Sequence, residues 1–204
     1  MSNTPDNSPR DRESSDSGAP DERDLDIDPF GSELTVEIRH DSQIAPLCDD
    51  QRIKTAVQVA AASRGFTKGD IGVRLTSDAT IREINAQFLQ HDYATDVISF
   101  GYEAESEYLS GELVVSVDTA ARVSATMGQS TIASDGADWP PDAELILYIV
   151  HGVLHITGMD DQDPESRSEM RRSELSVLTQ LGLNHVARFG ADMHPTLDAS
   201  EVSS

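Results

Sequence analysis

Two histidines and two aspartates that lie close together in the sequence are the residues of this chain best suited to chemistry. They belong to the segment His151-Gly152-Val153-Leu154-His155-Ile156-Thr157-Gly158-Met159-Asp160-Asp161. Residues four apart on a helix share one face, so His151 and His155 can present two imidazoles to one metal ion. Gly158 lets the chain turn, so that Asp160 or Asp161 can supply a third ligand and leave a position open for water or substrate, as catalytic zinc sites require.

An alternative for the same pair is two helix histidines that are hydrogen-bonded within a core. The glycine and the acids that follow the histidines favour the metal site. Metalloproteases of the H-E-x-x-H type carry a glutamate general base directly after the first histidine, whereas this chain has Gly152 there. That peptidase mechanism therefore lacks its base.

Helices are needed to position these side chains, and the apolar pattern predicts one from Asp142, as its N-cap, to about Thr157. Asp163-Pro164 is expected to start the last helix, because proline suits the first helical turn. Three further helices are expected: one that contains residues 53–61 and stops near Gly65, one after Ser77 or Asp78, and one over 119–127 with Asp118 as its N-cap.

Strands are predicted where short runs are β-branched or alternate between apolar and polar residues. These runs are 34–39, 71–75, 97–100 and 113–117, with Gly101 and Gly111 bracketing the connection between the last two. The order of strands and helices predicts an α+β fold, in which a small mixed β-sheet packs with about five helices.

The two ends of the chain differ in composition from its middle. Residues 1–30 hold nine acids and three arginines among Ser, Pro, Gly and Asn, so they are predicted to be a disordered acidic tail. Residues 187–204 are predicted to be a second disordered tail. One compact domain is expected between them, over residues 31–186.

Charge and composition exclude several classes of protein. The formal net charge of −22 argues against a broad basic face that grips nucleic acid. Cys48 is the only cysteine, which excludes an intramolecular disulfide and a four-thiolate metal site. The longest apolar run, 145–150, is far shorter than the roughly 20 residues that span a bilayer, so a soluble, cytoplasmic protein without a membrane partner is expected.

The histidine segment resembles the signature H-G-x-L-H-L-x-G-x-D-H of the YbeY endoribonuclease family. It matches that signature at His151, Gly152, Leu154, His155, Gly158 and Asp160. Upstream, Ile84-Asn85 and the run Thr95-Asp96-Val97-Ile98-Ser99-Phe100 resemble the family's L-N and T-D-V-L-S-F blocks, and Gly111-Glu112-Leu113 resembles its G-D-I strand. The similarity runs in order along residues 34–183.

This resemblance implies the zinc-dependent hydrolase-like YbeY fold and a single-strand-specific, metal-dependent endoribonuclease. The implied role is in 16S rRNA 3′-end maturation and ribosome quality control, with one Zn²⁺ per chain held by three side chains. The implied partners are single-stranded RNA, as the 16S rRNA precursor, and the small ribosomal subunit, but not DNA.

Two positions depart from the family pattern. Asp161 stands where the family has its third ligand histidine, and a carboxylate can bind zinc at a similar distance. Leu89 stands where the family usually has an arginine suited to gripping a phosphate. Arg82, or one of the arginines at 167, 171 and 172, is a candidate substitute for that cation.

The sequence thus yields a set of hypotheses about roles. The metal ligands are His151, His155 and Asp161, and the general base is Asp160 or Glu112, although Asp160 could instead steady a ligand imidazole. The candidates for substrate binding are Ser99, which is otherwise a plain strand residue, and Arg82. The alternatives are a non-catalytic ribosome-binding factor with a structural zinc, and a metallohydrolase of another substrate class.

Overall fold

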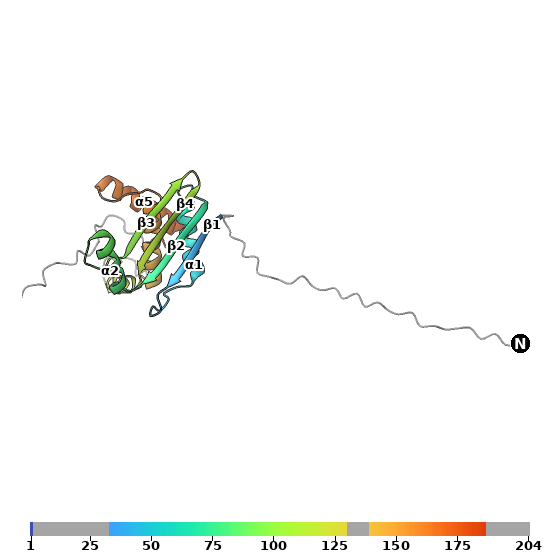
Figure 1. The fold of residues 1–204 in the computed structure, drawn as a ribbon, viewed down its shortest axis with the longest axis horizontal. Coiled ribbons are helices and arrows are strands. Elements are labelled where there is room, and N and C mark those ends of the chain that lie inside the picture. Colours follow the sequence, from blue (N-terminus) through green and yellow to red (C-terminus); the bar gives the residue numbers. More distant parts are fainter. Residues whose placement is uncertain (2–32, 130–138, 187–204) are drawn as a thin grey trace, which may run out of the picture. The chain divides into compact units, whose positions relative to one another are not determined.

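A computed structural model describes Met1, residues 33–129 and residues 139–186 (Figure 1). The helices and strands of these described residues all lie between Glu33 and Val186. The predicted tails, 2–30 and 187–204, lie outside the described residues, as does most of the loop expected between 128 and 141.

Four strands form one mixed sheet, as the sequence predicts. They are β1 (Glu33–His40), β2 (Lys68–Thr76), β3 (Val97–Glu105) and β4 (Tyr108–Ser116), in the order β1-β2-β4-β3. The strands β1, β2 and β4 are parallel, whereas β3 is antiparallel to β4 and forms one edge of the sheet. The α+β class is therefore confirmed.

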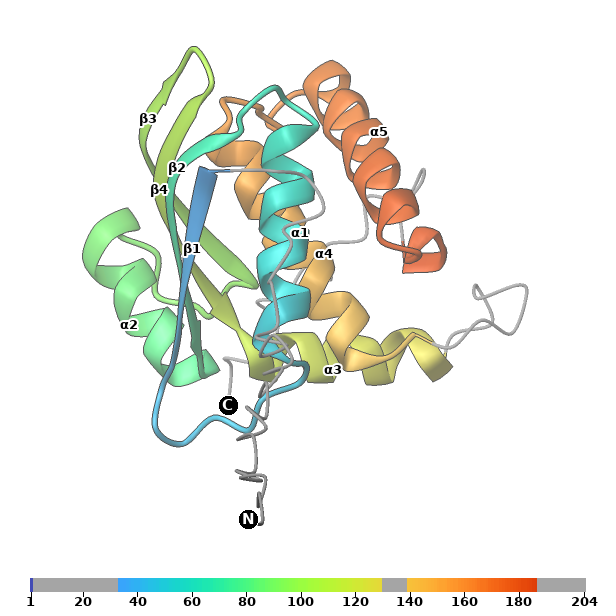
Figure 2. The same ribbon diagram turned by 90° about the vertical axis from the view of Figure 1, so that its right-hand side faces the viewer.

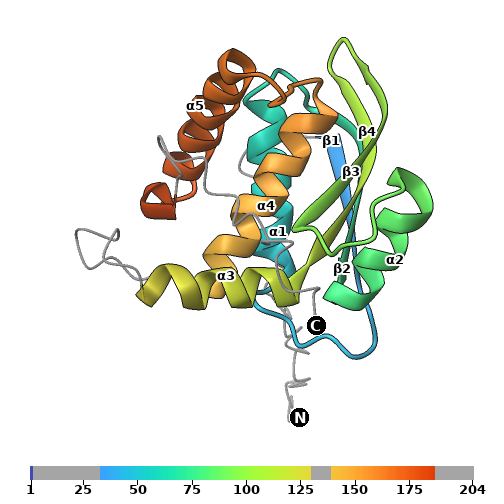
Figure 3. The ribbon, with the colours of Figure 1, turned by 90° about the vertical axis from the view of Figure 1, so that its left-hand side faces the viewer.

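Five α-helices surround this sheet within the described ranges. They are α1 (Asp50–Ala62), α2 (Asp78–Leu89), α3 (Val117–Gln129), α4 (Pro141–Ile156) and α5 (Pro164–Gln180), followed by the short 3₁₀ helix Asn184–Val186. Figures 2 and 3 show α2 on one face of the sheet and α1 with α4 on the other, where α5 covers the outer side of α4.

Helix α4 is the centre of the core. It contacts α1, α3, α5, β3 and β4, and twelve of its sixteen residues are buried. Because α4 carries apolar residues around most of its circumference, it is stable only when other elements enclose it. Any functional side chain on α4 therefore has a rigid base.

The hairpin between β3 and β4 corrects one expectation. Gly101 and Gly111 do not bracket the connection: they lie inside the two strands and pair with each other, and the turn is at Ser106 and Glu107. A Cβ at Gly111 would come within 2.6 Å of the Phe100 carbonyl oxygen and 2.9 Å of Cδ1 of Ile156. Glycine is used here because the last residue of α4 lies directly on the strand pair.

Two predicted helix caps are also wrong. Asp118 lies in the first turn of α3, where its carboxylate accepts a hydrogen bond from the Asp78 amide, and Ser116 Oγ accepts from the Thr119 amide instead. Asp142 lies in the first turn of α4, where its negative charge interacts favourably with the helix dipole, but it does not cap the helix. Its carboxylate pairs with Arg52 at 2.5 Å.

Other predicted helix starts are confirmed. Ser77 caps α2 by accepting from the Thr80 amide, and Asp163 caps α5, in which Pro164 is the first residue. Among the described residues, the helices are each too short or too polar to cross a membrane.

Candidate metal centre

Helix α4 presents His151 and His155 on one face, one turn apart. The two rings stand almost perpendicular, with centroids 4.5 Å apart, and their Nε2 atoms are 3.0 Å apart. The exposed fractions of the side chains are 14% and 27%, so both imidazoles open to solvent from the edge of the core. The predicted i, i+4 pairing is present.

Asp161 comes back to these histidines after a turn at Gly158, whose φ is +93°. Its two carboxylate oxygens each lie 3.8 Å from Nε2 of a histidine, Oδ2 from His151 and Oδ1 from His155. One ligand atom from each of the three residues lies within 4.8 Å of the others. The structure thus brings together the three residues predicted as metal ligands.

The partners of the two Nδ1 atoms determine what the Nε2 atoms can do. Nδ1 of His155 is 3.0 Å from the Met159 carbonyl oxygen, and Nδ1 of His151 is 2.7 Å from Oε1 of Glu174. Both partners accept hydrogen bonds, so each Nδ1 carries the proton. In the neutral rings both Nε2 atoms then hold lone pairs that face each other at 3.0 Å.

Facing lone pairs repel unless a cation lies between them. The histidine pair could hydrogen-bond to each other only if one ring became an imidazolium. Two imidazole nitrogens and a carboxylate oxygen are ligands that zinc takes, and three protein ligands leave its fourth position for water or substrate. The donor set therefore fits a divalent metal such as zinc.

The two histidines differ in their electrostatic surroundings. Burial lowers the pKa of His151, but the hydrogen bond and charge of Glu174, together with Asp96 and Asp161, outweigh it and raise the pKa above its ordinary value. Burial and the neighbouring His151 lower the pKa of His155. His155 is therefore neutral at physiological pH, with its Nε2 lone pair available.

The structure explains why position 152 is a glycine, which the sequence alone does not. A Cβ at this position would lie 2.7 Å from Cδ2 of Leu113, 3.0 Å from Cγ2 of Val97 and 3.1 Å from Oγ of Ser99. Glycine thus lets α4 press against β3 and β4 between the two histidines. The same contact places Ser99 on the face of the sheet that carries the histidines.

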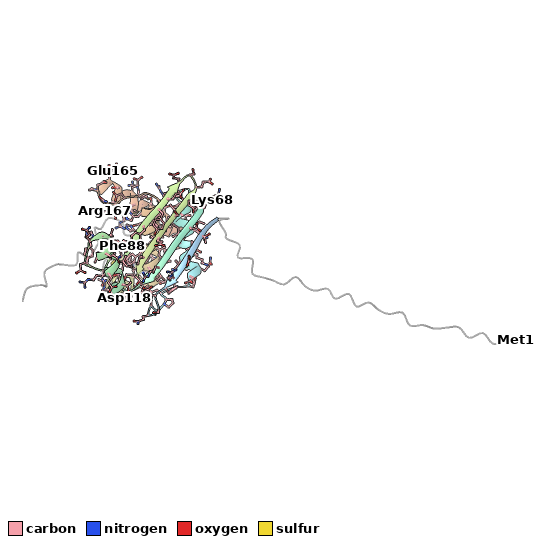
Figure 4. The ribbon with its side chains drawn as sticks, in the orientation of Figure 1. Met1, Lys68, Phe88, Asp118, Glu165 and Arg167 are labelled. Atoms are coloured by element: carbon pink, nitrogen blue, oxygen red, sulfur yellow. The ribbon has the colours of Figure 1, made fainter. Side chains whose placement is uncertain are left out.

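The loop that carries Asp161 is held by α5. Arg167 is labelled on α5 in Figure 4. Its Nε donates to the Asp161 carbonyl oxygen at 3.1 Å, and its Nη2 donates to the Gln162 carbonyl oxygen at 3.2 Å. Asp160 is exposed, and its Oδ1 accepts from the Asp161 amide at 2.8 Å. Asp160 therefore lies beside the ligand group with a carboxylate open to solvent.

The other sequence candidates lie on the opposite side of the sheet. Glu112 faces the α2 side, where it lines a groove of about 440 Å³ together with Phe100 and Tyr102. Arg82 is exposed on α2 and donates two hydrogen bonds to Asp92, at 2.7 and 3.0 Å. The structure does not bring these two residues to the histidines.

One residue of the site, Glu174, was not singled out from the sequence, and it is fully buried on α5. Asp96, which belongs to the run that resembles the family's T-D-V-L-S-F block, lies before β3 and raises the pKa of His151 by its charge. The sequence pattern of α5 could have indicated Glu174. This residue shares the apolar stripe of the helix with Met170, Val177 and Leu178, where an acidic residue is rarely buried unless it is paired.

The fold and the donor set together define an α+β protein with a candidate centre for a metal ion. The sequence model of the family described as Endoribonuclease YbeY matches residues 33–182. The chain therefore belongs to the YbeY family, as the motif resemblance predicts.

Proteins similar to this chain include curated relatives and solved structures. A protein named Endoribonuclease YbeY from Rhodopirellula baltica is 45% identical over 145 residues, 71% of each chain. Another of that name, from Phocaeicola vulgatus, is 36% identical over 127 residues, 62% of this chain and 84% of the relative. The solution structure of TM1509 from Thermotoga maritima has 19% identity and a TM-score of 0.48, and the match covers 74% of this chain and 93% of that one.

Proposed function

We propose that this protein is a zinc-dependent endoribonuclease that cleaves single-stranded RNA. The proposed role is in 16S rRNA 3′-end maturation and ribosome quality control in the cytoplasm, with the 16S rRNA precursor and the small ribosomal subunit as partners. Membership of the YbeY family supports the nuclease class. The observation that carries the proposal is the convergence of His151 Nε2, His155 Nε2 and the Asp161 carboxylate while both Nδ1 atoms are engaged elsewhere.

In this proposal His151, His155 and Asp161 hold one zinc ion. When bound, zinc supplies a Lewis acid that makes a phosphodiester more open to attack by water. The chain keeps both imidazoles in the ligand tautomer, through Glu174 for His151 and the Met159 carbonyl for His155. Arg167 fixes the backbone of the loop that carries Asp161.

Asp160 is the proposed proton acceptor. Its carboxylate is exposed next to Asp161, whereas Glu112 faces the other side of the sheet and is less suited to the role. Ser99 is the proposed substrate contact, because its hydroxyl lies next to Gly152 on the histidine face of the sheet and the residue is partly exposed. Arg82 would contact phosphate only if it released Asp92.

The test combines metal analysis of the purified protein with cleavage assays on single-stranded RNA, duplex RNA and DNA. We expect about one zinc per chain, cleavage of single-stranded RNA alone, loss of cleavage with a chelator and recovery with added zinc. Asp160→Asn should keep the zinc and lose most of the rate. Protein without bound zinc, or cleavage that a chelator leaves unchanged, would contradict the proposal.

Leu89 favours a second candidate, a non-catalytic factor that binds the ribosome and has a structural zinc. Leucine replaces the cation implied by the family resemblance, so this position offers no charge to a phosphate. The exposed fraction of Leu89 is 48%, so the side chain is not a buried core residue. Zinc-loaded protein that binds small subunits but leaves every RNA intact would select this candidate. Cleavage of a peptide or ester with RNA intact would select a different metallohydrolase.

A further inference from the structure

A buried ion pair on α5 lies directly behind His151. The Glu174 side chain is fully buried, and its Oε1 is 2.7 Å from Nδ1 of His151. Nη1 of Arg171, one turn earlier on α5, donates to both carboxylate oxygens of Glu174, at 2.9 and 2.8 Å. Hydrogen bonds thus connect the Arg171 guanidinium to the Glu174 carboxylate and this carboxylate to the His151 imidazole.

Packing alone does not account for this arrangement. Burying a carboxylate is strongly unfavourable unless it is paired and hydrogen-bonded, and replacing a buried ion pair with apolar residues of similar volume is often neutral or stabilising. Glu174 shares its helix face with Met170, Val177 and Leu178, so a leucine would continue the core. The contact that a leucine could not make is the one to His151.

The two histidines also differ in what stands behind them. The Met159 carbonyl behind His155 is neutral, whereas the carboxylate behind His151 is charged. A carboxylate that accepts from the far nitrogen of an imidazole fixes the tautomer and the ring direction and raises the basicity of the ligand nitrogen. Helix α5 would therefore contribute to metal affinity without supplying a ligand.

We infer that Glu174 is a positioning residue for the metal ligand His151, and that Arg171 holds the Glu174 carboxylate in place for this role. The inference rests on the proposed metal site, and it assigns to the Arg171–Glu174 pair control of how tightly that site binds. Loss of the pair should change the tautomer and orientation of His151 more than those of His155, because His151 is the histidine in direct contact with Glu174.

Zinc affinity of the full chain, measured by competition with a chromophoric chelator, tests this role. Glu174→Leu should weaken zinc binding by about 10–100-fold, the usual effect of losing such a partner. Glu174→Gln keeps an oxygen that can accept from Nδ1, so it should lose clearly less affinity than Glu174→Leu. Glu169→Gln, an exposed position on the same helix, is the matched control and should bind as the wild type does.

Stability must be separated from positioning, because Glu174→Leu leaves Arg171 without its carboxylate. The double variant Glu174→Leu/Arg171→Met removes both charges, so its melting temperature without metal should recover toward that of the wild type. Zinc affinity should stay low in this variant. Histidine ¹⁵N spectra of the metal-free protein should show His151 with its Nδ1 proton in the wild type and mixed tautomers in the double variant.

Two results would overturn the inference. One is wild-type zinc affinity in folded Glu174→Leu, and the other is affinity that recovers together with stability in the double variant, which would make the pair purely structural. A wild-type protein that binds no zinc would instead refute the proposed metal site itself, so the two failures can be told apart.

Discussion

The two faces of the sheet in this protein are built for different tasks. On the α4 face, two histidines and an aspartate converge, and each histidine has a hydrogen-bond partner behind it. On the α2 face, the C-terminal end of the helix presents Phe88, which Figure 4 labels, and Leu89. Their exposed fractions are 59% and 48%. The first region brings together three side chains that could hold a metal ion, whereas the second presents apolar surface where the family resemblance implies a cation.

The arginines sharpen this contrast. On α5, Arg171 neutralises Glu174 and Arg167 holds the ligand loop, so both support the metal centre. On α2, Arg82 is paired with Asp92. With a formal net charge of −22, the chain would have to attract RNA mainly through the metal and local contacts. The comparison teaches that the chain keeps a candidate metal site although it lacks the cation that the family resemblance implies on α2.

Removing the ligand histidines should have the largest effect. His151→Ala and His155→Ala should each lose most bound zinc, because each removes one of two nitrogen ligands. Asp161→Ala should weaken zinc binding less, and Asp161→His should retain it. Zinc content by mass spectrometry of metals measures all four, and Asp142→Asn at the far end of α4 is the control. Equal zinc content in the wild type and the double histidine variant would show that these histidines do not bind the metal, and the proposed contrast between the two faces would then be wrong.

Gly152 offers the next largest effect, because it seats the histidine helix on the sheet. Gly152→Ala should lower stability by about 1–3 kcal/mol, since its Cβ would overlap Leu113 and Val97. Gly101→Ala is the matched control, because its Cβ would have its nearest neighbour at 3.7 Å. Thermal melts should show a clear fall for the first variant and little change for the second.

A glutamate at position 152 sharpens the same point. Gly152→Glu would complete the H-E-x-x-H pattern, yet the side chain has no space between α4 and the strands. We expect unfolded or strongly destabilised protein and no peptidase activity. A stable variant with wild-type melting behaviour would show that the contact between α4 and the sheet is looser than the structure indicates.

The sequence predicted the parts of the site that are local in the chain. His151, His155 and Asp161 fall within one helix turn and the loop after it, so covalent geometry alone brings them close. Glu174 and Asp96 reach the same place through tertiary packing, which periodicity does not report. Without the packing, Gly152 could be interpreted only as a missing base, although its small size is what the fold requires.

The sheet shows the same limit. Alternation and β-branched runs predict its strands, but the same reasoning places Gly101 and Gly111 around the connection, whereas they lie within the strands where α4 ends. Glycine marks both turns and close approaches, and a single sequence does not distinguish the two. The helix starts at Ser77 and Asp163 are predicted correctly because these side chains cap amides within three residues. The caps at Asp118 and Asp142 are not, because these carboxylates contact Asp78 and Arg52 instead.

Leu89→Arg tests the α2 side of the comparison. Because Leu89 is about half exposed, the new guanidinium would not be buried, and the melting temperature should stay unchanged. We expect single-stranded RNA to bind about fivefold more tightly at low salt, or roughly 1 kcal/mol, and the salt dependence to steepen by about 0.7 per phosphate contacted. Leu89→Gln is the matched control, since it adds polarity without charge.

The result also decides between the two candidate functions. A gain in RNA binding or cleavage would mean that the C-terminal end of α2 contacts the RNA and lacks a cation to bind its phosphate. Unchanged stability with no gain in affinity or rate would contradict that idea and favour the non-catalytic ribosome-binding factor.

The smallest expected effect concerns the N-terminal end of α2, which Asp78 ties to the sheet. The carboxylate of Asp78 accepts from Ser116 Oγ at 2.5 Å, Thr119 Oγ1 at 2.6 Å and Arg122 Nη2 at 3.1 Å. Burial alone would raise the pKa of Asp78, but these three donors outweigh it and lower the pKa. Asp78→Asn should therefore reduce the free energy of unfolding at neutral pH by roughly 1 kcal/mol.

The pH dependence gives the sign of this contribution. A carboxyl group whose pKa is lowered by folding stabilises the native state above its unfolded pKa of about 3.9, and this stabilisation disappears as the pH falls through the folded value. Urea unfolding at pH 7 and below pH 4 should thus show a difference between the wild type and Asp78→Asn that shrinks in acid, while Glu83→Gln, exposed on α2, changes little at either pH. A difference that stays constant with pH would mean that the Asp78 charge does not hold α2, and that the two faces of the sheet are fixed to the core by packing alone.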